Sequence, residues 1–487
     1  MIQPTLHKCV IIGAGFSGIC LGIQLKKAGI NDFVILEKRG EVGGTWRDNH
    51  YPGAECDVPS ALYSFSFETK TDWDYTWSEQ PQILDYIKAT VRRHELTQHI
   101  RCNKAVREAN YNPGSARWLL RLADGETLET QFLVSAVGQL HEPNIPNIPG
   151  RESFSGPSFH SANWQHDVDL RGKSVAVIGN AASAVQFIPE LAKHAAQLSV
   201  FQRSANWVAR KRDMPYSERQ KNLRRALPVL QKLTRLKIYL RNEWLVFPGL
   251  RGNRLSRWLL RQSCLSYLDS VVTDAELRRK LLPDYPIGAK RILVVEGYYE
   301  ALMRENVALV DTPIRAIEPG GVRTADGTLT PCDVLVYGTG FVTNPFLHGI
   351  TIRGESGTPL AQHWQRGARA YLGIATAGFP NLFFLYGPNT NLGHNSILLM
   401  SESQSRLIVQ AIQLVDANAV RALQVRAEAE RAYDDRLQHR LRHMVWSEVA
   451  QSWYKTDDRI TNNWPGSAGE YRRATRRLRQ RDFLLTP

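Results

Sequence analysis

The apolar positions near the start of the chain predict a strand, a tight turn, a helix and a second strand. An apolar run from Val10 to Ile12 leads into Gly13-Ala14-Gly15-Phe16-Ser17-Gly18, and the apolar positions that follow repeat at helical spacing. A second apolar run then ends on Glu37, about 20 residues after the last of these glycines. This is a complete G-x-G-x-x-G pattern in its strand, turn and helix setting, so we expect a dinucleotide site here.

Each position of the pattern has a physical reason. Gly13 permits the turn, Gly15 lets the backbone approach a pyrophosphate, and Gly18 permits close packing of helix against strand. Glu37 can accept a hydrogen bond from a ribose hydroxyl. The residues assigned to this first site are Gly13, Gly15, Phe16, Ser17, Gly18 and Glu37.

A second unit of the same kind runs from Lys173 to Ser204. Its turn reads Gly179-Asn180-Ala181-Ala182-Ser183-Ala184, with alanine where the first unit has its second and third glycines. The strand that closes this unit ends in Gln202-Arg203-Ser204, and a guanidinium suits a 2′-phosphate as a carboxylate does not. We therefore favour NADPH over NADH at a second site that includes Gly179, Asn180, Ala182, Ser183, Gln202, Arg203 and Ser204. The alternative for Arg203 is one more solvated cation in a basic region.

The string ADGETLETQFLVSAVG, which ends at Gly138, is similar to ADGTLTPCDVLVYGTG, which ends at Gly340. Each predicts a hairpin strand that leads into a buried strand. The whole second nucleotide unit lies between them, so the predicted fold is α/β with two Rossmann-like domains, the second inserted into the first. The boundaries predicted near Pro149 and Cys332 divide the chain into 1–149, 150–332, 333–425 and a helical, basic tail over 426–487. The proline-rich stretch from Glu142 to Gly150 is the predicted hinge.

Composition narrows the class of protein. With 487 residues, 43% of them hydrophobic and 22% charged, the chain has the composition of an ordinary globular protein. Its six cysteines are far apart, without a C-x-x-C pair or metal-ligand spacing, so we expect reduced thiols and no metal site. No apolar run approaches the ~18 residues of a membrane span, and the first one begins too early for a signal peptide. A cytoplasmic protein is the expectation.

The formal net charge of +14 is concentrated in two segments. Between Arg203 and Arg261 there are 16 lysines and arginines against three acids, and Glu470 to Asp482 carries six arginines. Neither segment contains a nucleic-acid-binding motif, so we expect no nucleic-acid partner. Within a predicted helical insert at about 211–285, leucines recur at helical spacing from Leu223 to Leu240. We favour a helical cap with a solvated basic face, and the alternative is weak peripheral contact with an anionic membrane.

The string from Phe154 to Trp164 resembles the fingerprint of a known family. FSGPSFHSANW matches the F-x-G-x-x-x-H-x-x-x-W fingerprint of Baeyer-Villiger monooxygenases, within the flavin-containing monooxygenase superfamily, through Phe154, Gly156, His160 and Trp164. The chain resembles that family along nearly its whole length, although Gln165 stands where the family commonly has proline. The resemblance implies that 1–149 and 333–425 bind FAD and that 150–332 binds NADPH.

The resemblance also implies roles for single residues. Gly44, Thr45, Trp46, Asp57, Tyr63 and Val106 correspond to positions near FAD, and Lys290 to a ligand of the NADPH 2′-phosphate. His160 is expected to act in the hinge and not as a base, and Trp453-Tyr454 either wall the substrate pocket or belong to the core.

The reaction that the resemblance implies begins with reduction of FAD by NADPH. Oxygen then adds to the flavin as a C4a-peroxide, which attacks a ketone or aldehyde and yields an ester or lactone. Arg291 would stabilise the anionic peroxide and Asp57 would orient Arg291, whereas a structural ion pair is the plainer alternative for both. Oxygenation of sulfur or nitrogen with the same cofactors stays open, as does a non-catalytic nucleotide-binding flavoprotein.

Overall fold

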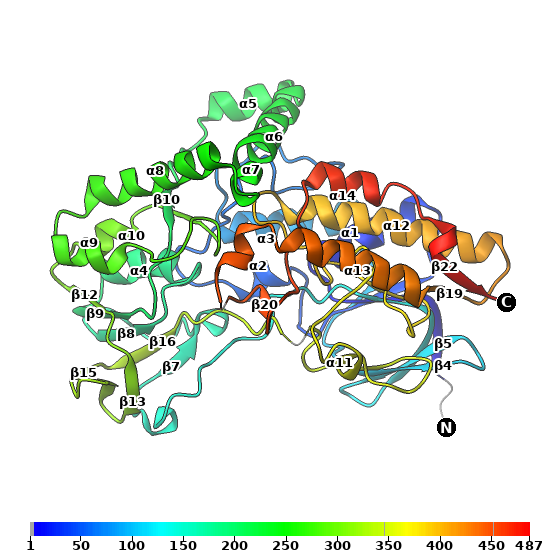
Figure 1. Ribbon diagram of the computed structural model, residues 1–487, viewed down its shortest axis with the longest axis horizontal. Helices are drawn as coiled ribbons and strands as arrows, with labels where there is room; N and C mark the ends of the chain where they lie inside the picture. The colour runs from blue at the N-terminus through cyan, green and yellow to red at the C-terminus, as the bar shows by residue number, and fades with distance from the viewer. Residues whose placement is uncertain (1–3, 345, 451) are drawn as a thin grey trace.

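The chain is built on two sheets that lie side by side, each covered by helices (Figure 1). The computed structural model describes residues 4–344, 346–450 and 452–487. Eight strands form the first sheet: β1 (Thr5–Ile12), β2 (Phe33–Leu36), β3 (Ile100–Arg101), β4 (Val106–Asn112), β5 (Arg117–Leu122), β6 (Thr127–Ser135), β17 (Thr351–Arg353) and β18 (Leu382–Phe384). Their order is β17-β4-β5-β6-β1-β2-β3, with β18 beside β6. The strands β3, β2, β1 and β6 run parallel, and β4, β5 and β6 form an antiparallel meander.

Five parallel strands form the second sheet: β7 (Ser158–His160), β8 (Ser174–Ile178), β9 (Gln197–Phe201), β12 (Val307–Val310) and β16 (Val334–Tyr337). Their order is β12-β9-β8-β16-β7. Before β16 comes a separate antiparallel meander of β13 (Ile314–Glu318), β14 (Gly321–Thr324) and β15 (Leu329–Pro331). The two similar sequence strings therefore occupy equivalent places, because each ends in a strand beside the first strand of its own nucleotide unit.

The second sheet is an insertion in the first, since β17 and β18 return to the first sheet after β16. This agrees with the predicted fold class. The boundary predicted near Cys332 is wrong in detail, because β16 begins at Val334 and pairs with both β7 and β8. The chain leaves the second sheet only after Tyr337, where Gly338 begins the return segment.

The two connections between the sheets pair with each other. The amide of Asn144 donates to the carbonyl of Gly340 at 2.9 Å, and the amide of Val342 donates to the carbonyl of Glu142 at 2.8 Å. The predicted proline-rich hinge is thus one half of a two-stranded connection, whose other half follows β16.

Helices fill the spaces around the sheets. The first sheet packs against α1 (Phe16–Lys27), α3 (Gln80–Arg93) and α12 (Ile397–Ala417), and the second against α4 (Ala184–Ala192) and α10 (Tyr298–Leu302). Both cores consist mainly of aliphatic and aromatic side chains that water does not reach, and this burial is the main favourable contribution to folding. Two short helices, α2 (Thr45–Asp48) and α11 (Leu360–His363), lie in loops of the first domain.

A helical segment follows the short strand β10 (Val208–Arg210) and returns to it through β11 (Leu293–Val295), which pairs with β10 in parallel. Its helices are α5 (Glu218–Ala226), α6 (Val229–Arg241), a π-helical turn η4 (Asn242–Val246), α7 (Phe247–Leu250), α8 (Arg254–Val271) and α9 (Ala275–Leu281). Pro228 separates α5 from α6. The helices α5 and α6 project from the top of the molecule in Figure 1.

The C-terminal part returns to the first domain. Its elements are β19 (Ala422–Val425), α13 (Ala427–Leu441), β20 (Lys455–Thr456), β21 (Arg459–Ile460), α14 (Ala468–Ala474) and β22 (Phe483–Thr486). The last strand, β22, pairs with β19 in antiparallel fashion, so the end of the chain is fixed beside α12 and α13. Within the described residues, no helix is long and apolar enough to cross a membrane.

One packing detail explains an irregularity of the second nucleotide motif. In the first unit a side chain on Gly18 would come within 2.0 Å of the Gly13 carbonyl oxygen and 3.5 Å of the Ala136 Cβ. In the second unit Ala184 replaces that glycine, and the residue opposite it is Gly338, where a Cβ would lie 2.8 Å from the Ala184 Cβ. The small residue has moved from the helix to the strand end, so the close helix–strand packing is kept.

Candidate active site

A single cavity of about 1330 Å³ lies where the carboxyl ends of the strands of both sheets meet. Residues directly after β1, β2, β8 and β9 line it, as expected for nucleotide sites in open α/β sheets. All the predicted cofactor residues line this cavity except Gly18, which packs against Gly13. Its volume exceeds the ~300–1,000 Å³ typical of a drug-sized ligand, as expected for a cleft that takes two dinucleotides and a substrate.

The first nucleotide cradle is built from backbone. Gly13 has a φ of +108°, and Gly15 lies so close to Gly44 that a Cβ on Gly44 would be 3.0 Å from the Gly15 Cα. No side chain caps the N-terminus of α1, so its first amides face the cavity, where they suit a pyrophosphate. The residues present therefore fit the phosphates of a dinucleotide.

Glu37 is buried at the end of β2 and its carboxylate fixes the cradle. One carboxylate oxygen accepts from the amide of Ala14 at 2.9 Å, and the other accepts from the amide of Arg39 at 3.0 Å. Arg47 makes a salt bridge with it at 3.3 Å. Glu37 thus holds the glycine turn in place in addition to lining the cavity, a role that the sequence pattern does not reveal.

Aromatic side chains form the wall beyond this cradle. The indole N–H of Trp46 donates to the Tyr63 hydroxyl at 3.0 Å, and Phe16 meets the Tyr63 ring edge-on with centroids 5.4 Å apart. Burial raises the pKa of Tyr63 well above its ordinary value, so this hydroxyl stays protonated. Thr45 and Val106 also line the cavity, and the aromatic wall has the apolar character that a flat ring system requires.

The second cradle is electropositive. The ammonium of Lys290 lies 3.3 Å from the Ser204 hydroxyl and 4.4 Å from the centroid of the Tyr285 ring. Its pKa is lowered, first by burial and then by the positive charge of Arg203. Two cations that repel one another beside a serine hydroxyl form a site for a doubly charged anion such as a phosphate monoester.

The other predicted members of this cradle hold its shape. Asn180 donates to the Gln202 side chain at 2.9 Å and to the Ser204 carbonyl at 3.1 Å, which ties the glycine turn to the end of β9. Gly179 has a φ of +101°, and a Cβ there would come within 2.5 Å of the Gly338 carbonyl oxygen. Ala182 and Ser183 lie at the start of α4 and line the cavity.

Between the two cradles lies an ion pair of Arg291 and Asp57. The Nε of Arg291 donates to Oδ2 of Asp57 at 2.6 Å, and its Nη2 lies 2.5 Å from the same oxygen. Arg291 comes just before β11, whereas Asp57 belongs to the first domain, in a loop held by Gln186 of α4 through the Glu55 backbone. Asp57 raises the pKa of Arg291 more than burial lowers it, so the guanidinium keeps its charge.

The chain is similar to known proteins along nearly its whole length. A family model described as pyridine nucleotide-disulphide oxidoreductase matches residues 10–244. A Baeyer-Villiger monooxygenase of Pseudomonas aeruginosa is 38% identical over 483 residues, which cover 98% of this chain and 91% of that protein. The chain belongs to the Baeyer-Villiger monooxygenase family. The family predicted from the fingerprint is thereby confirmed.

Solved structures agree with this assignment. A steroid monooxygenase bound to NADP superimposes with a TM-score of 0.88 at 30% identity, over 99% of this chain and all of that one. The monooxygenase OTEMO, in complex with FAD and NADP, gives the same TM-score at 28% identity and the same coverage. Both neighbours therefore hold NADP, and OTEMO also holds FAD, the two cofactors predicted from the sequence.

This Baeyer-Villiger monooxygenase lacks the dithiol of a disulphide reductase. Among the described residues no group of cysteine, histidine and acidic side chains is arranged to hold a metal ion, and all six cysteines are free. Cys56 lines the cavity, and burial raises its pKa well above the ordinary value, so its thiol is not a ready nucleophile.

The fingerprint residues lie beside the cavity and do not line it. His160 ends β7 next to Tyr337 of β16, and its Nδ1 accepts from the amide of Ala162 at 3.1 Å. Burial lowers the pKa of His160, and its ring meets Phe341 of the return connection edge-on. Trp164 packs in the core of the second domain.

The other two fingerprint residues fix the backbone of the same region. A Cβ on Gly156 would come within 2.1 Å of the Asp333 carbonyl oxygen, and Phe154 packs on the core beside β16. The fingerprint therefore lies where the paired connections meet the second sheet.

Several cavity residues were missed in the sequence. Gln139 donates to the Tyr386 carbonyl at 3.2 Å while its own carbonyl oxygen is buried without a partner, and the Tyr386 hydroxyl donates to Asn391 at 2.9 Å. Tyr386 has a φ of +57°, which no sequence pattern indicates for a tyrosine. Of the pair left open, Trp453 lines the cavity and Tyr454 is buried behind it.

Proposed function

We propose that this Baeyer-Villiger monooxygenase uses FAD and NADPH to insert one atom of O₂ beside the carbonyl group of a ketone or aldehyde. The balanced reaction consumes substrate, O₂, NADPH and a proton, and gives ester or lactone, NADP⁺ and water. FAD, when bound, supplies the activation of O₂ with electrons taken from NADPH. The observation that carries the proposal is the Arg291–Asp57 pair, which lines the cavity between the two nucleotide cradles.

Arg291 is proposed to stabilise the negative charge that develops during oxygen transfer. Its Nε donates to one oxygen of Asp57 and its Nη2 makes a salt bridge to the same oxygen, so the other N–H donors of the guanidinium can bind an anion in the cavity. A guanidinium held rigidly in a site shielded from water stabilises such a charge without reorganising. Asp57 is a positioning residue in this account, since it fixes the plane of the guanidinium and balances its charge between turnovers.

Lys290, Arg203 and Ser204 are proposed to bind the 2′-phosphate that distinguishes NADPH from NADH. Support comes from the Lys290 ammonium at the Ser204 hydroxyl and from the lowered pKa of Lys290, to which the charge of Arg203 contributes and which an anion would restore. The first cradle, with Glu37, Gly15 and Gly44, is proposed to hold FAD.

The fingerprint residues are proposed to act in the hinge. His160 touches one connection through Phe341 and ends a strand of the second sheet, so it can transmit a change in the angle between the domains. Its lowered pKa is that of a neutral imidazole, which supports a structural role over that of a proton carrier.

Product analysis tests the proposal. Purified holoprotein is given NADPH, O₂ and a panel of linear, cyclic and aryl ketones with one thioether, and the products are separated by gas chromatography. We expect NADPH consumption that depends on the ketone and yields ester or lactone. Sulfoxide as the sole product would overturn the proposal in favour of heteroatom oxygenation. NADPH and O₂ left unconsumed would favour a non-catalytic flavoprotein.

A further inference from the structure

Helix α6 is inverted with respect to an ordinary surface helix. The side that faces the protein carries polar groups beside Ile238 and Tyr239, which pack against the core. Gln231 is 2% exposed, and the Arg235 guanidinium donates to the carbonyls of Leu62 and Ser64 at 3.0 and 2.8 Å. The side that faces solvent is apolar, with Leu233 55% and Leu236 49% exposed. An amphipathic helix on a globular protein normally buries its leucines, because each costs free energy in water.

The spacing shows that this face is continuous. Val229, Leu233 and Leu236 follow one another at intervals of four and three residues, so they lie on one stripe of the helix. Lys232 and Lys237 flank the stripe, one on each side, at successive helical angles of 100° per residue. Both lysines are exposed to solvent.

Exposed apolar side chains also occur before and after α6 in the chain. Ten of the nineteen exposed large hydrophobic side chains of the described chain lie between Leu223 and Leu259, and Trp244 in η4 is 74% exposed. On α8, Leu255, Trp258 and Leu259 occupy one exposed face at intervals of three and one residues, opposite buried Cys264. We call this set the apolar rim: Leu223, Leu227, Val229, Leu233, Leu236, Trp244, Leu245, Leu255, Trp258 and Leu259.

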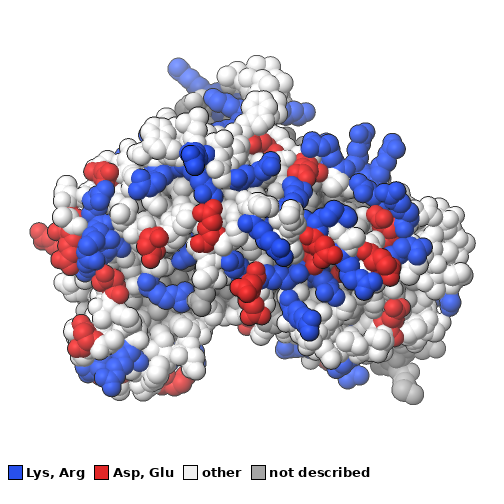
Figure 2. Space-filling model, viewed as in Figure 1, with Lys and Arg blue, Asp and Glu red and all other residues white. Residues whose placement is uncertain are grey.

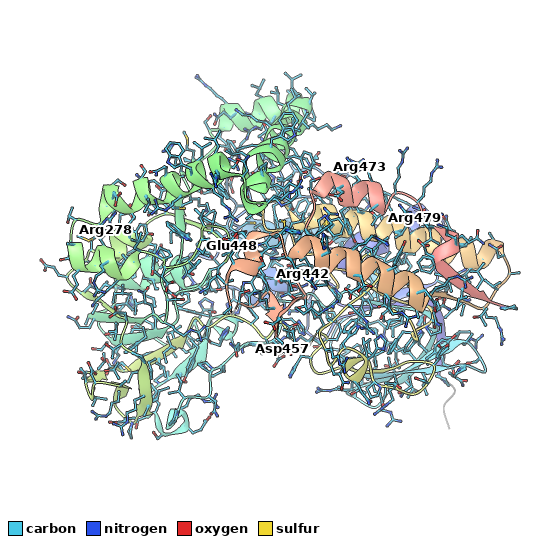
Figure 3. The ribbon with its side chains drawn as sticks, viewed as in Figure 1. Arg278, Arg442, Glu448, Asp457, Arg473 and Arg479 are labelled. Carbon is cyan, nitrogen blue, oxygen red and sulfur yellow. The ribbon has the colours of Figure 1, made fainter. Side chains whose placement is uncertain are left out.

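Positive charge surrounds the apolar rim. Figure 2 shows the projecting part of the molecule, where α5 and α6 lie in Figure 1, white at its tip with lysine and arginine side chains on both sides. The second basic segment of the sequence lies next to it, because α14 packs on Tyr239 of α6 and carries Arg472 and Arg473. Figure 3 shows Arg473 on α14 along this upper edge.

We propose that the apolar rim docks reversibly on a lipid bilayer that carries anionic headgroups. Exposed leucines and tryptophans flanked by lysines are the composition of a helix that lies in the plane of a membrane surface, with its apolar side among the acyl chains. Lysine stems can follow the apolar side while their ammonium groups reach the phosphates. The docking concerns this surface alone and does not depend on the reaction assigned to the cavity.

The charge distribution selects this occupant over a second copy of the chain. A symmetric dimer would place the same surface of both copies in contact, and with it the exposed cations beside the rim of each copy, such as Lys232 and Lys237. Like charges brought together in this way oppose association, whereas an anionic surface attracts these exposed cations.

Vesicle co-sedimentation of the full-length holoprotein tests the proposal. Vesicles contain phosphatidylcholine alone or with about one-third phosphatidylglycerol, at about 50 mM and about 500 mM NaCl. We expect binding to the anionic vesicles at low salt, weaker binding at high salt, and little binding to phosphatidylcholine alone. Lys232→Gln/Lys237→Gln should weaken binding about 30-fold, and Leu233→Ser/Leu236→Ser about 10- to 100-fold.

A matched control is Leu329→Ser/Leu484→Ser, which changes two exposed leucines on β15 and β22, away from α6 in Figure 1. It should bind vesicles as the unchanged protein does, and all variants should keep their thermal midpoint. Lipids brominated on the acyl chain should quench part of the tryptophan fluorescence, and Trp244→Phe should reduce that quenching.

Three results would overturn the proposal. The first is no binding to anionic vesicles at low salt, and the second is equal binding by folded Leu233→Ser/Leu236→Ser. The third is a dimer of the unchanged protein, seen by light scattering, that is absent in Leu233→Ser/Leu236→Ser, with no vesicle binding by either protein. The apolar rim would then bind a second copy of the chain.

Discussion

Replacement of Arg291 by alanine tests the proposed chemistry most sharply, because its partner and its neighbour in the sequence provide built-in comparisons. Loss of one preorganised donor to a developing anion typically costs about 10²–10³ in kcat. The substitution also removes the cation that lies 2.6 Å from the Asp57 carboxylate, so this carboxylate is left unpaired beside the same anion. At an effective dielectric constant of about 20, two such charges a few ångströms apart repel by about 4 kcal/mol before screening. We therefore expect ester formation by Arg291→Ala to fall at least about 10³-fold.

The double variant separates these two contributions. Asp57→Ala alone keeps the positive charge but frees the guanidinium to rotate, so we expect a loss of about tenfold. Arg291→Ala/Asp57→Ala removes the repulsive carboxylate as well and should be more active than Arg291→Ala by about tenfold. The assay measures ester, hydrogen peroxide and NADPH consumption side by side, with bound FAD checked by its absorbance.

Lys290→Ala is the matched control, since Lys290 is adjacent in sequence yet faces the second cradle. It should raise the KM for NADPH and leave the ratio of ester to NADPH consumed unchanged. If folded, FAD-loaded Arg291→Ala formed ester within about fivefold of the unchanged protein, the proposed role of this residue would be refuted.

Three further outcomes follow from the contacts. Lys290→Ala and Arg203→Ala should each raise the KM for NADPH about 10- to 100-fold and barely change that for NADH, and equal effects on both cofactors would remove the 2′-phosphate assignment. Gly338→Ala should lower stability by about 1–3 kcal/mol in thermal denaturation, because its Cβ would lie 2.8 Å from that of Ala184, and adding Ala184→Gly should restore part of the loss; no recovery would show that the two do not compensate. Burial alone would raise the pKa of Glu243, but its hydrogen bonds to His394, Ala468 and Asn395 lower this pKa below 4.5, so the ionised carboxylate stabilises the fold above that pH and loses this effect as the pH falls. The difference in thermal midpoint between the unchanged protein and Glu243→Gln should therefore shrink below about pH 4.5. A difference that stays constant with pH would contradict this.

Local patterns predicted the two glycine turns that line the cavity, because the residues of each turn are neighbours in sequence. The glycine turn, its helix and the residue at the end of the next strand lie within about 30 residues, so Gly13, Gly15 and Glu37 were recognisable together. The second unit was predicted in spite of its alanines. What made Ala184 acceptable, the absence of a side chain on Gly338, is a contact between distant parts of the chain.

Features that depend on distant contacts were missed or misplaced. The boundary predicted near Cys332 precedes β16, which belongs to the second sheet. A buried strand has the same apolar pattern in either sheet, so the sequence does not show which sheet it joins. The apolar spacing of α6 predicted its helix but not which side faces water: Leu233 and Leu236 are exposed on the same face as Lys232 and Lys237. Gln139 and Tyr386 line the cavity, but these residues are far apart in the sequence and only the folded chain brings them together.

Oxygen labelling tests the central claim most directly. Purified holoprotein with NADPH and cyclohexanone, or another ketone of the panel that it consumes, is incubated under ¹⁸O₂ and the product is examined by mass spectrometry. The account predicts an ester or lactone that carries one ¹⁸O atom, and the second atom in water. Ketone recovered unchanged across the whole panel, with ¹⁸O found only in hydrogen peroxide or in a sulfoxide, would contradict it.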